Sequence, residues 1–199
     1  MTDKETRMEN TPQTPPPASQ PAARWRDLLV LLSGAGLIIA FDQYTKALVV
    51  KHIPFLGTWL PPELADLQPY FRIVHWHNSG AAFGLFQDGN LVFTILAIVA
   101  SAFIIAFFPS IEKHEWGLRT AMVFQLGGAV GNLIDRLRFG YVIDYISIGD
   151  FPVFNVADAS ISVGVAILLL DVLLTEWRER KVNAGQTESH TRPSEEFDS

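Results

Sequence analysis

The sequence has 199 residues, no cysteine and a formal net charge of −6, and 49% of its residues are hydrophobic. The lack of cysteine excludes disulfides, thiol catalysis and cysteine-based metal sites, and no basic stripe indicates nucleic acid as a partner. Polar and charged residues are concentrated in 1–27 and 179–199. We predict that these segments are disordered tails on either side of one hydrophobic domain, 28–178.

Four stretches of that domain have the length of membrane-spanning helices. A bilayer core takes about 20 apolar residues in a helix. The predicted spans cover about residues 28–50, 90–108, 118–137 and 156–176. The first is not a cleavable signal peptide, because it follows a proline-rich tail and is too long for a signal-peptide core. The sequence therefore predicts an all-α polytopic membrane protein with four transmembrane helices.

The distribution of positive charge predicts the orientation of these spans. Cytoplasmic loops of membrane proteins are enriched in lysine and arginine. The two tails and the 109–119 loop carry ten such residues, whereas segments 51–90 and 136–155 carry four. We therefore expect both termini in the cytoplasm and these two segments on the outer side of the membrane.

The first outward segment, 51–90, is long enough to have structure of its own. Residues 70–78 (YFRIVHWHN) are rich in β-branched and aromatic residues, which favours a strand. Residues 78–86 (NSGAAFGLF) are typical of a tight turn that leads into an interfacial segment. His75 and His77 could share one strand face as metal ligands, but the sequence offers no third ligand, so we predict no metal site.

Two charged residues, Asp42 and Lys46, lie in the outward part of the first span. An ionisable residue inside a span is costly, so it is usually paired, buried in protein or functional. Their four-residue spacing puts both on one helix face and allows an ion pair. The pattern fits a structural pair and a site role equally well.

The third span ends in GGAVGNLIDR, whose polar residues form a stripe. Gly128, Asn132 and Asp135 recur at helical spacing on one face. Gly128 would let another helix approach closely, and Asn132 and Asp135 would form a polar seam. Arg136 could pair with Asp135 or reach the lipid headgroups.

Asp144 and Asp158 form the candidate catalytic pair. Asp144 lies in a short apolar, strand-like run without an adjacent counter-charge, and Asp158 lies in the first turn of the fourth span, after Asn155. A helix N-terminus favours carboxylates, so a capping role is the alternative for Asp158. The two can meet, because the short segment between them must return to the membrane. Two close carboxylates in a partly dry site share one proton near neutral pH, which suits acid–base hydrolysis of an amide.

Together these segments resemble one known family, the bacterial lipoprotein signal peptidases, also called signal peptidase II. The resemblance covers about residues 28–178. It rests on five motifs in the family's order: DQYTK (42–46), NSGAAFGLF (78–86), GGAVGNLIDR (127–136), YVIDY (141–145) and FNVAD (154–158). It implies four transmembrane helices, with a small periplasmic β-cradle and an interfacial helix between the first two.

The resemblance also implies an activity and a site. The enzyme would be an aspartyl endopeptidase of the bacterial inner membrane, without cofactor or metal, that removes the signal peptide from diacylglyceryl-modified prolipoproteins before the lipidated cysteine. Asp144 and Asp158 would be its catalytic dyad, and Asp135 would be structural. The positions that would line or support the site are Asp42, Lys46, Asn78, Gly80, Gly128, Asn132, Arg136, Asn155 and Ala157. Its partners would be prolipoproteins and membrane lipids, and we expect a monomer.

Rival functions explain the acidic residues less well. A small proton-coupled transporter would use aspartates as relay groups at several membrane depths, but here they cluster at one interface, apart from Asp171. A presenilin-type protease would place both aspartates within spans and carry a GxGD motif, which is absent. A non-enzymatic scaffold would leave the pair of Asp144 and Asp158 unexplained.

Overall fold

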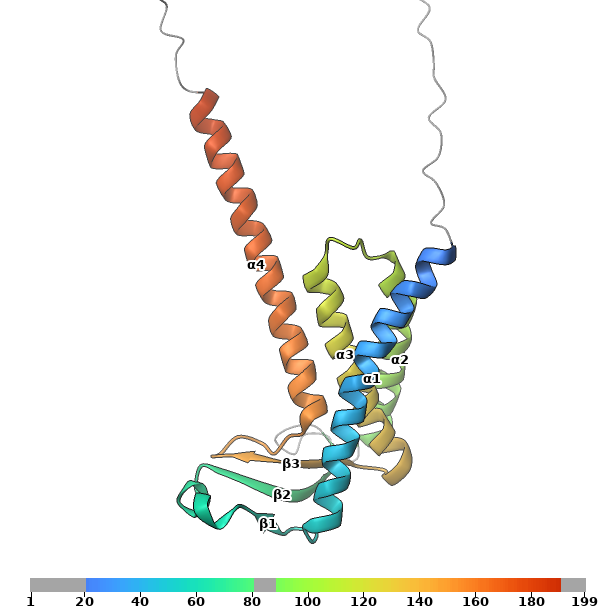
Figure 1. Cartoon of the computed structure of the whole chain (residues 1–199), viewed down its shortest axis with the longest axis vertical. Coiled ribbons are helices and arrows are strands. Elements are labelled where there is room, and N and C mark those ends of the chain that lie inside the picture. The colour runs from blue at the N-terminus through green and yellow to red at the C-terminus, as the bar shows by residue number, and fades with distance from the viewer. Residues whose placement is uncertain (1–20, 81–88, 191–199) are drawn as a thin grey trace, which may run out of the picture.

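The computed structural model describes residues 21–80 and 89–190, and in it four long helices stand on a small sheet (Figure 1). The helices are α1 Pro21–His52, α2 Asn90–Phe107, α3 Trp116–Phe139 and α4 Val156–His190, with the short 3-10 helices η1 Pro62–Leu67 and η3 Phe108–Ser110. The strands are β1 Thr58–Trp59, β2 Phe71–Asn78 and β3 Val142–Ile148. Most of the segment predicted to be interfacial, and the outer parts of both predicted tails, lie outside the described residues.

Helices α1 and α4 are longer than the spans predicted from hydrophobicity. Helix α1 begins at Pro21, where a proline suits the first helical turn, so residues 21–27 are helical rather than part of a tail. Helix α4 continues to His190, because the polar residues after the apolar span include many strong helix formers. Residues 179–190, which we assigned to the other tail, are therefore helical too.

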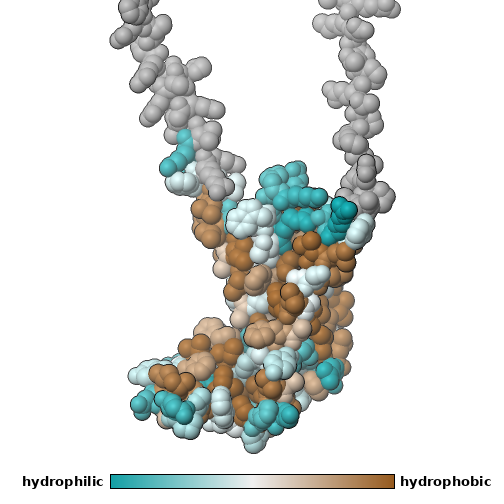
Figure 2. Space-filling view, in the orientation of Figure 1, coloured by the Kyte–Doolittle hydropathy of each residue, from teal (hydrophilic) through white to brown (hydrophobic). Residues whose placement is uncertain are grey.

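Three helices are long and apolar enough to cross a membrane: Arg24–His52, Asn90–Ser110 and Val156–Trp177. Figure 2 shows hydrophobic residues along the helical bundle and hydrophilic residues at its far end and on the sheet. Helix α3 is not among the three, since its second half carries the polar motif GNLIDRLR. It contacts α1, α2 and α4, and its polar residues Asn132 and Asp135 are buried among them, whereas Arg138 is exposed. The chain is thus a multi-pass membrane protein.

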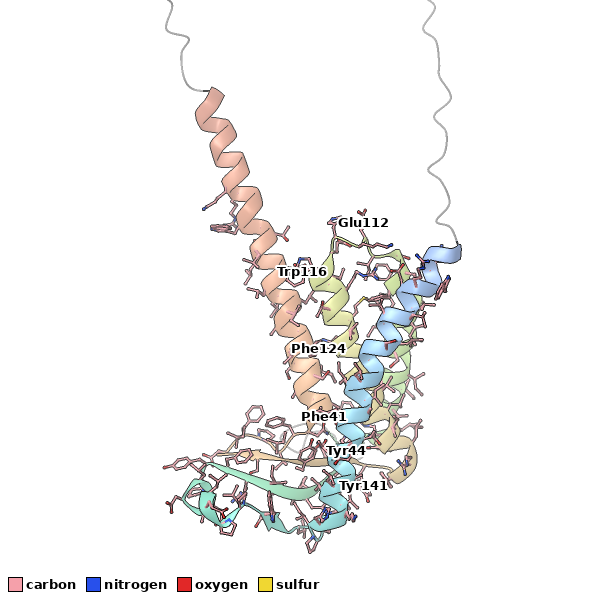
Figure 3. All side chains as sticks on the ribbon, viewed as in Figure 1. Phe41, Tyr44, Glu112, Trp116, Phe124 and Tyr141 are labelled. Carbon is pink, nitrogen blue, oxygen red and sulfur yellow. The ribbon has the colours of Figure 1, made fainter. Side chains whose placement is uncertain are left out.

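The three strands form one antiparallel sheet in the order β1-β2-β3. The sheet lies at the end of the bundle opposite to the start of α1 and the end of α4 (Figure 1). Glu112 and Trp116 mark that distant end, and Tyr44 and Tyr141 lie near the sheet (Figure 3). The predicted strand at 70–78 and the strand-like run around Asp144 are both confirmed.

The apolar core lies in the half of the bundle away from the sheet. It is formed by Leu31, Ala35, Phe108, Met122 and Leu126, with smaller contributions from neighbouring side chains. A second small cluster around Val49, Ile53 and Tyr145 packs α1 against the sheet. Buried polar residues occupy the space between the two apolar clusters, and this space contains the candidate site.

Candidate active site

A pocket of about 1020 Å³ lies between the sheet and the adjoining ends of α2, α3 and α4. Asp144 from β3 and Asp158 from α4 both line it. The other lining residues that we predicted from sequence are Asn78, Gly80, Asn132 and Arg136. The fold therefore brings both candidate aspartates into one cavity.

Asp144 is held in the sheet, where β3 pairs it with Trp76 of β2. Its side chain is 1% exposed. One carboxylate oxygen accepts a hydrogen bond from Asn78 Nδ2 at 2.9 Å, and the other accepts one from Asn155 Nδ2 at 2.7 Å. Burial, followed by the nearby Asp158 carboxylate, raises the pKa of Asp144 to about 7, although both amide donors oppose the shift.

Asp158 and Asn155 form a reciprocal cap at the start of α4. Asn155 Oδ1 accepts the backbone N–H of Asp158 at 2.9 Å, and Asp158 Oδ2 accepts the backbone N–H of Asn155 at 3.2 Å. Such caps satisfy helix N–H groups that have no partner within the helix. The capping role considered for Asp158 is present, but it does not compete with a site role, since Asp158 also lines the pocket.

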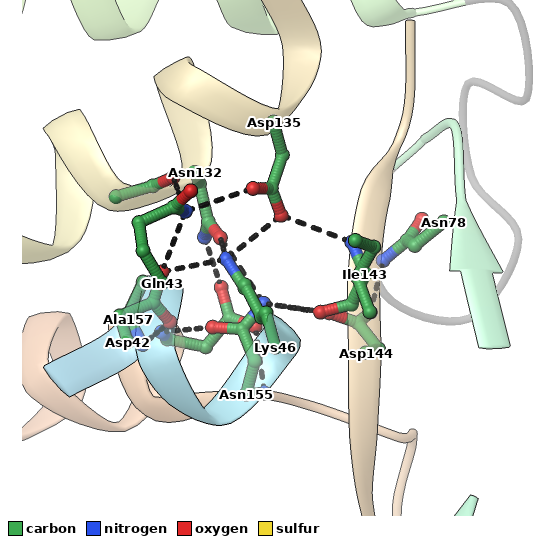
Figure 4. A network of polar contacts seen from close by, with 12 residues as sticks. Asp42, Gln43, Lys46, Asn78, Asn132, Asp135, Ile143, Asp144, Asn155 and Ala157 are labelled. Atoms are coloured by element: carbon green, nitrogen blue, oxygen red, sulfur yellow. Dashed lines mark hydrogen bonds and ion pairs between the residues drawn. The ribbon is translucent and has the colours of Figure 1, made fainter. Parts of the chain in front are cut away.

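Two asparagines connect the aspartates to each other. Asn155 is fully buried, and its Nδ2 donates to Asn132 Oδ1 at 3.0 Å as well as to Asp144. Asn132 Nδ2 donates to Asp158 Oδ1 at 2.7 Å. Asn155 therefore contacts both Asp144 and Asp158 directly. The side-chain amides of Asn132 and Asn155 connect the two aspartates in one hydrogen-bond network (Figure 4).

Lys46 of α1 contacts this network from the side away from the pocket, and it forms the centre of a buried ion cluster. Its Nζ is 2.8 Å from Asp42 Oδ2 and 2.9 Å from Asp135 Oδ2, and all three side chains are at most 1% exposed. The ion pair that the spacing of Asp42 and Lys46 predicted is therefore present. Lys46 also donates to Asn132 Oδ1 at 3.0 Å, which links the cluster to the aspartate network.

Gln43 is a member of this cluster that sequence reasoning missed. Its Nε2 donates to Asp135 Oδ1 at 2.8 Å, to the backbone oxygen of Gly131 at 3.1 Å and, more weakly, to Asp42 Oδ2 at 3.3 Å. A polar amide inside a predicted span, next to Asp42, was the signal that could have revealed it.

The remaining supporting residues take different roles. Helices α3 and α4 approach so closely that a Cβ at Gly128 would clash with the backbone oxygen of Ala157, as the small-residue stripe predicted. The Gly80 N–H donates to Asn78 Oδ1 at 3.0 Å. Asp135 pairs with Lys46 rather than with Arg136, whose guanidinium lies 5.6 Å from the ring of Phe93 on the pocket wall.

His75 and His77 lie side by side on β2, with ring centroids 5.2 Å apart. The Nδ1–H of His75 donates to the backbone oxygen of Ile53 at 2.8 Å. His77 stacks between Phe55 and Tyr141. Within the part of the chain that the structure describes, no group of three histidine or acidic side chains is arranged to bind a metal ion.

Comparison with known proteins identifies the family. Residues 35–174 match the family described as signal peptidase (SPase) II. The chain is 37% identical over 174 residues to the lipoprotein signal peptidase of Bartonella tribocorum, covering 83% of this chain and 98% of that protein. It is 41% identical over 148 residues to that of Brevibacillus brevis, covering 73% and 96%.

A solved structure described as a bacterial membrane enzyme, determined by the in meso method at 2.3 Å resolution, shares the fold with a TM-score of 0.64. It is 24% identical in sequence, and the match covers 85% of this chain and 94% of that one. This likeness shows a shared fold. The family match and the curated relatives show that the chain belongs to the signal peptidase II family.

Proposed function

We propose that this chain is an aspartyl endopeptidase of the bacterial inner membrane that cuts diacylglyceryl-modified prolipoproteins before the lipidated cysteine. The observation that carries the proposal is the pocket lined by Asp144 and Asp158, both hydrogen-bonded to Asn155. The curated relatives named lipoprotein signal peptidase supply the class of substrate.

The paired carboxylates can perform hydrolysis by themselves. With a pKa of Asp144 of about 7, the pair holds one proton near neutral pH. The ionised carboxylate takes a proton from a water molecule, whose oxygen attacks the scissile carbonyl carbon, while the protonated carboxyl gives its proton to the carbonyl oxygen. When the tetrahedral intermediate collapses, the C–N bond breaks, the carboxyl that took the water proton gives it to the departing nitrogen, and one hydroxyl of the intermediate returns its proton to the other carboxylate. Water is the only co-reactant, and both carboxyl groups regain their starting protonation states.

The position of the pocket suits a substrate that stays in the bilayer. Phe93 of α2 and Val163 of α4 line it together with the aspartates, and both helices are apolar enough to cross a membrane. A diacylglyceryl group anchored in lipid would therefore present the neighbouring peptide bond at the depth of the aspartates. The apolar lining would contact the lipidated segment.

We also propose that α3 is a fourth span, that both termini lie in the cytoplasm, and that the sheet and the site lie on the periplasmic side. Its 24 residues extend about 36 Å, enough for a bilayer core of roughly 30 Å. The described ends of the chain, the start of α1 and the end of α4, both lie on the side of the bundle opposite to the sheet (Figure 1), as an even number of spans requires. Both aspartates and their supporting residues come from one chain, which supports a monomer.

The test is a gel-shift cleavage assay in detergent with a lipidated prolipoprotein, its unmodified form, and the variants Asp144→Asn and Asp158→Asn. Wild type should cut only the lipidated form. Each variant should lose at least about 10³-fold in rate, because an amide side chain cannot exchange the proton. Size-exclusion profiles check that the variants are folded. Cleavage by both variants would rule out the two-aspartate mechanism, and cleavage of the unmodified form would rule out the substrate class.

A further inference from the structure

The ion cluster around Lys46 contacts the peptide groups next to both aspartates. Asp42 Oδ1 accepts the backbone N–H of Ala157 at 2.9 Å, and Ala157 directly precedes Asp158. Asp135 Oδ2 accepts the backbone N–H of Ile143 at 3.1 Å, and Ile143 directly precedes Asp144. Each carboxylate of the cluster therefore binds the backbone immediately before one aspartate, once on α4 and once on β3 (Figure 4).

Lys46 and Gln43 bridge these two carboxylates. The ammonium of Lys46 contacts both, at 2.8 and 2.9 Å. The amide nitrogen of Gln43 contacts Asp135 at 2.8 Å and Asp42 at 3.3 Å. Two buried carboxylates would repel each other without donors between them, and hydrogen bonds to charged groups are strong where water is excluded. The two bridges thus fix the distance between Asp42 and Asp135.

Lys46 also determines the orientation of a donor to Asp158. An ammonium group only donates, so the oxygen of the Asn132 amide must face Lys46. The amide nitrogen of Asn132 then faces Asp158, to which it donates at 2.7 Å. Asp158 is consequently constrained both through its backbone and through its side chain by groups that Lys46 binds.

We propose that Gln43 is a positioning residue which, together with Lys46, sets the spacing of Asp144 and Asp158 through Asp42 and Asp135. The inference rests on the proposed function, since it assumes that these aspartates perform the hydrolysis. Gln43 has no hydrogen bond to Asp144 or Asp158 and does not line the pocket. It therefore acts through other residues, and its loss should affect the rate rather than substrate binding.

The experiment compares Gln43→Met with wild type in the lipidated-substrate assay and measures kcat, KM and Tm. Methionine keeps the length and helix propensity of glutamine but has no N–H group to donate. Since a displacement of about 1 Å in a reacting site can cost about 10²-fold, we expect kcat to fall roughly tenfold or more. KM should stay within about twofold, because a group that acts only on the reacting geometry leaves binding unchanged.

Tyr44 supplies the matched control. It is the next residue of α1, its side chain is 62% exposed, and Figure 3 shows it close to the sheet on the same helix. Tyr44→Leu should keep wild-type kcat and KM. A second variant is Asp135→Asn. It should fold, because the asparagine oxygen can still accept the Ile143 N–H and Asp42 still pairs with Lys46. Its kcat should fall, because the charged bridge between Lys46 and residue 135 is gone.

The outcomes separate this inference from the proposed function. Wild-type kcat in both Gln43→Met and Asp135→Asn would overturn the positioning role. A fall in kcat matched by an equal fall in the folded fraction would also overturn it, because the effect would then be structural. If wild type itself did not cut the lipidated substrate, the proposed function would fail first and this inference with it.

Discussion

Helices α1 and α3 are joined by ion pairs at both ends of their interface, and the two ends differ in composition and in burial. At the end away from the sheet, Asp27 Oδ1 lies 2.6 Å from Arg119 Nη2, with side chains 12% and 13% exposed. Arg119 also donates to the backbone oxygen of Ile111 and lies over the Phe108 ring. At the sheet end, Lys46 faces two carboxylates and all three are more deeply buried.

The difference indicates what each end contributes. The distant pair joins one carboxylate to one guanidinium, and Arg119 also contacts the backbone of Ile111 and the ring of Phe108. The cluster at the sheet carries one more negative charge than positive, and it extends through hydrogen bonds to the aspartates that line the pocket. We therefore expect changes at the distant end to reduce stability first and changes at the site end to reduce activity first.

The largest effect on activity outside the aspartates should come from Asn155. Asn155→Ala removes the direct link between Asp144 and Asp158, and we expect kcat to fall about 10²-fold. It also removes the cap of α4, which should cost about 1 kcal/mol of stability. Enzyme kinetics and thermal unfolding in detergent measure the two effects.

Asn155→Ser distinguishes the cap from the link. A serine hydroxyl can still accept the Asp158 N–H, but it does not replace the amide nitrogen that reaches Asp144 and Asn132. We expect this variant to recover stability without recovering activity. Wild-type activity in Asn155→Ser would mean that only the cap matters.

The distant pair should show the opposite behaviour. Arg119→Met removes the arginine that pairs with Asp27. Removal of one partner from a buried ion pair lowers the free energy of unfolding by about 3 kcal/mol. We expect Tm to fall by about 6–12 °C, while kcat of the folded enzyme stays at the wild-type value. The double variant Asp27→Leu with Arg119→Met removes both charges and should recover part of the lost Tm. A drop in kcat in folded Arg119→Met would contradict the separation of the two ends.

The site could be predicted from sequence wherever its contacts are local. The spacing of Asp42 and Lys46 predicted their ion pair, and Asn155 and Asp158 are close enough in sequence to suggest a cap. The strand character around Asp144 followed from its β-branched and aromatic neighbours. Each of these features depends on a helical or strand repeat within a few residues.

Contacts between distant segments could not be predicted in this way. Lys46 and Asp135 are 89 residues apart, and their pairing depends on how α1 and α3 are rotated and shifted against each other. Arg136 was the nearer candidate in sequence, but neighbouring helix residues face different directions. The same rotation brings Gln43 against Gly131 and Asp135, so its role became visible only in three dimensions.

Stability should also depend on pH through Asp144. Burial raises the folded pKa of this carboxyl from an ordinary value near 3.8 to about 7. Because the folded value is higher than the unfolded one, Asp144 lowers the stability of wild type increasingly as pH rises from about 4 to about 7. Below about pH 4 the carboxyl is protonated in both states, and the penalty disappears.

Asp144→Asn tests this sign, because asparagine has nearly the shape of the protonated carboxyl but stays neutral at every pH. We expect its Tm to exceed that of wild type at pH 8 and to match wild type at pH 4. The control is Asp150→Asn, which changes an exposed aspartate in the same β3–α4 connection and should leave Tm unchanged at both pH values. A gain in Asp144→Asn that was equal at pH 4 and pH 8 would mean that packing, rather than the buried charge, separates the variant from wild type. A loss at pH 8 would mean that the amide donors of Asn78 and Asn155 outweigh the cost of burying the carboxylate, and the site end would then stabilise the fold as the distant pair does.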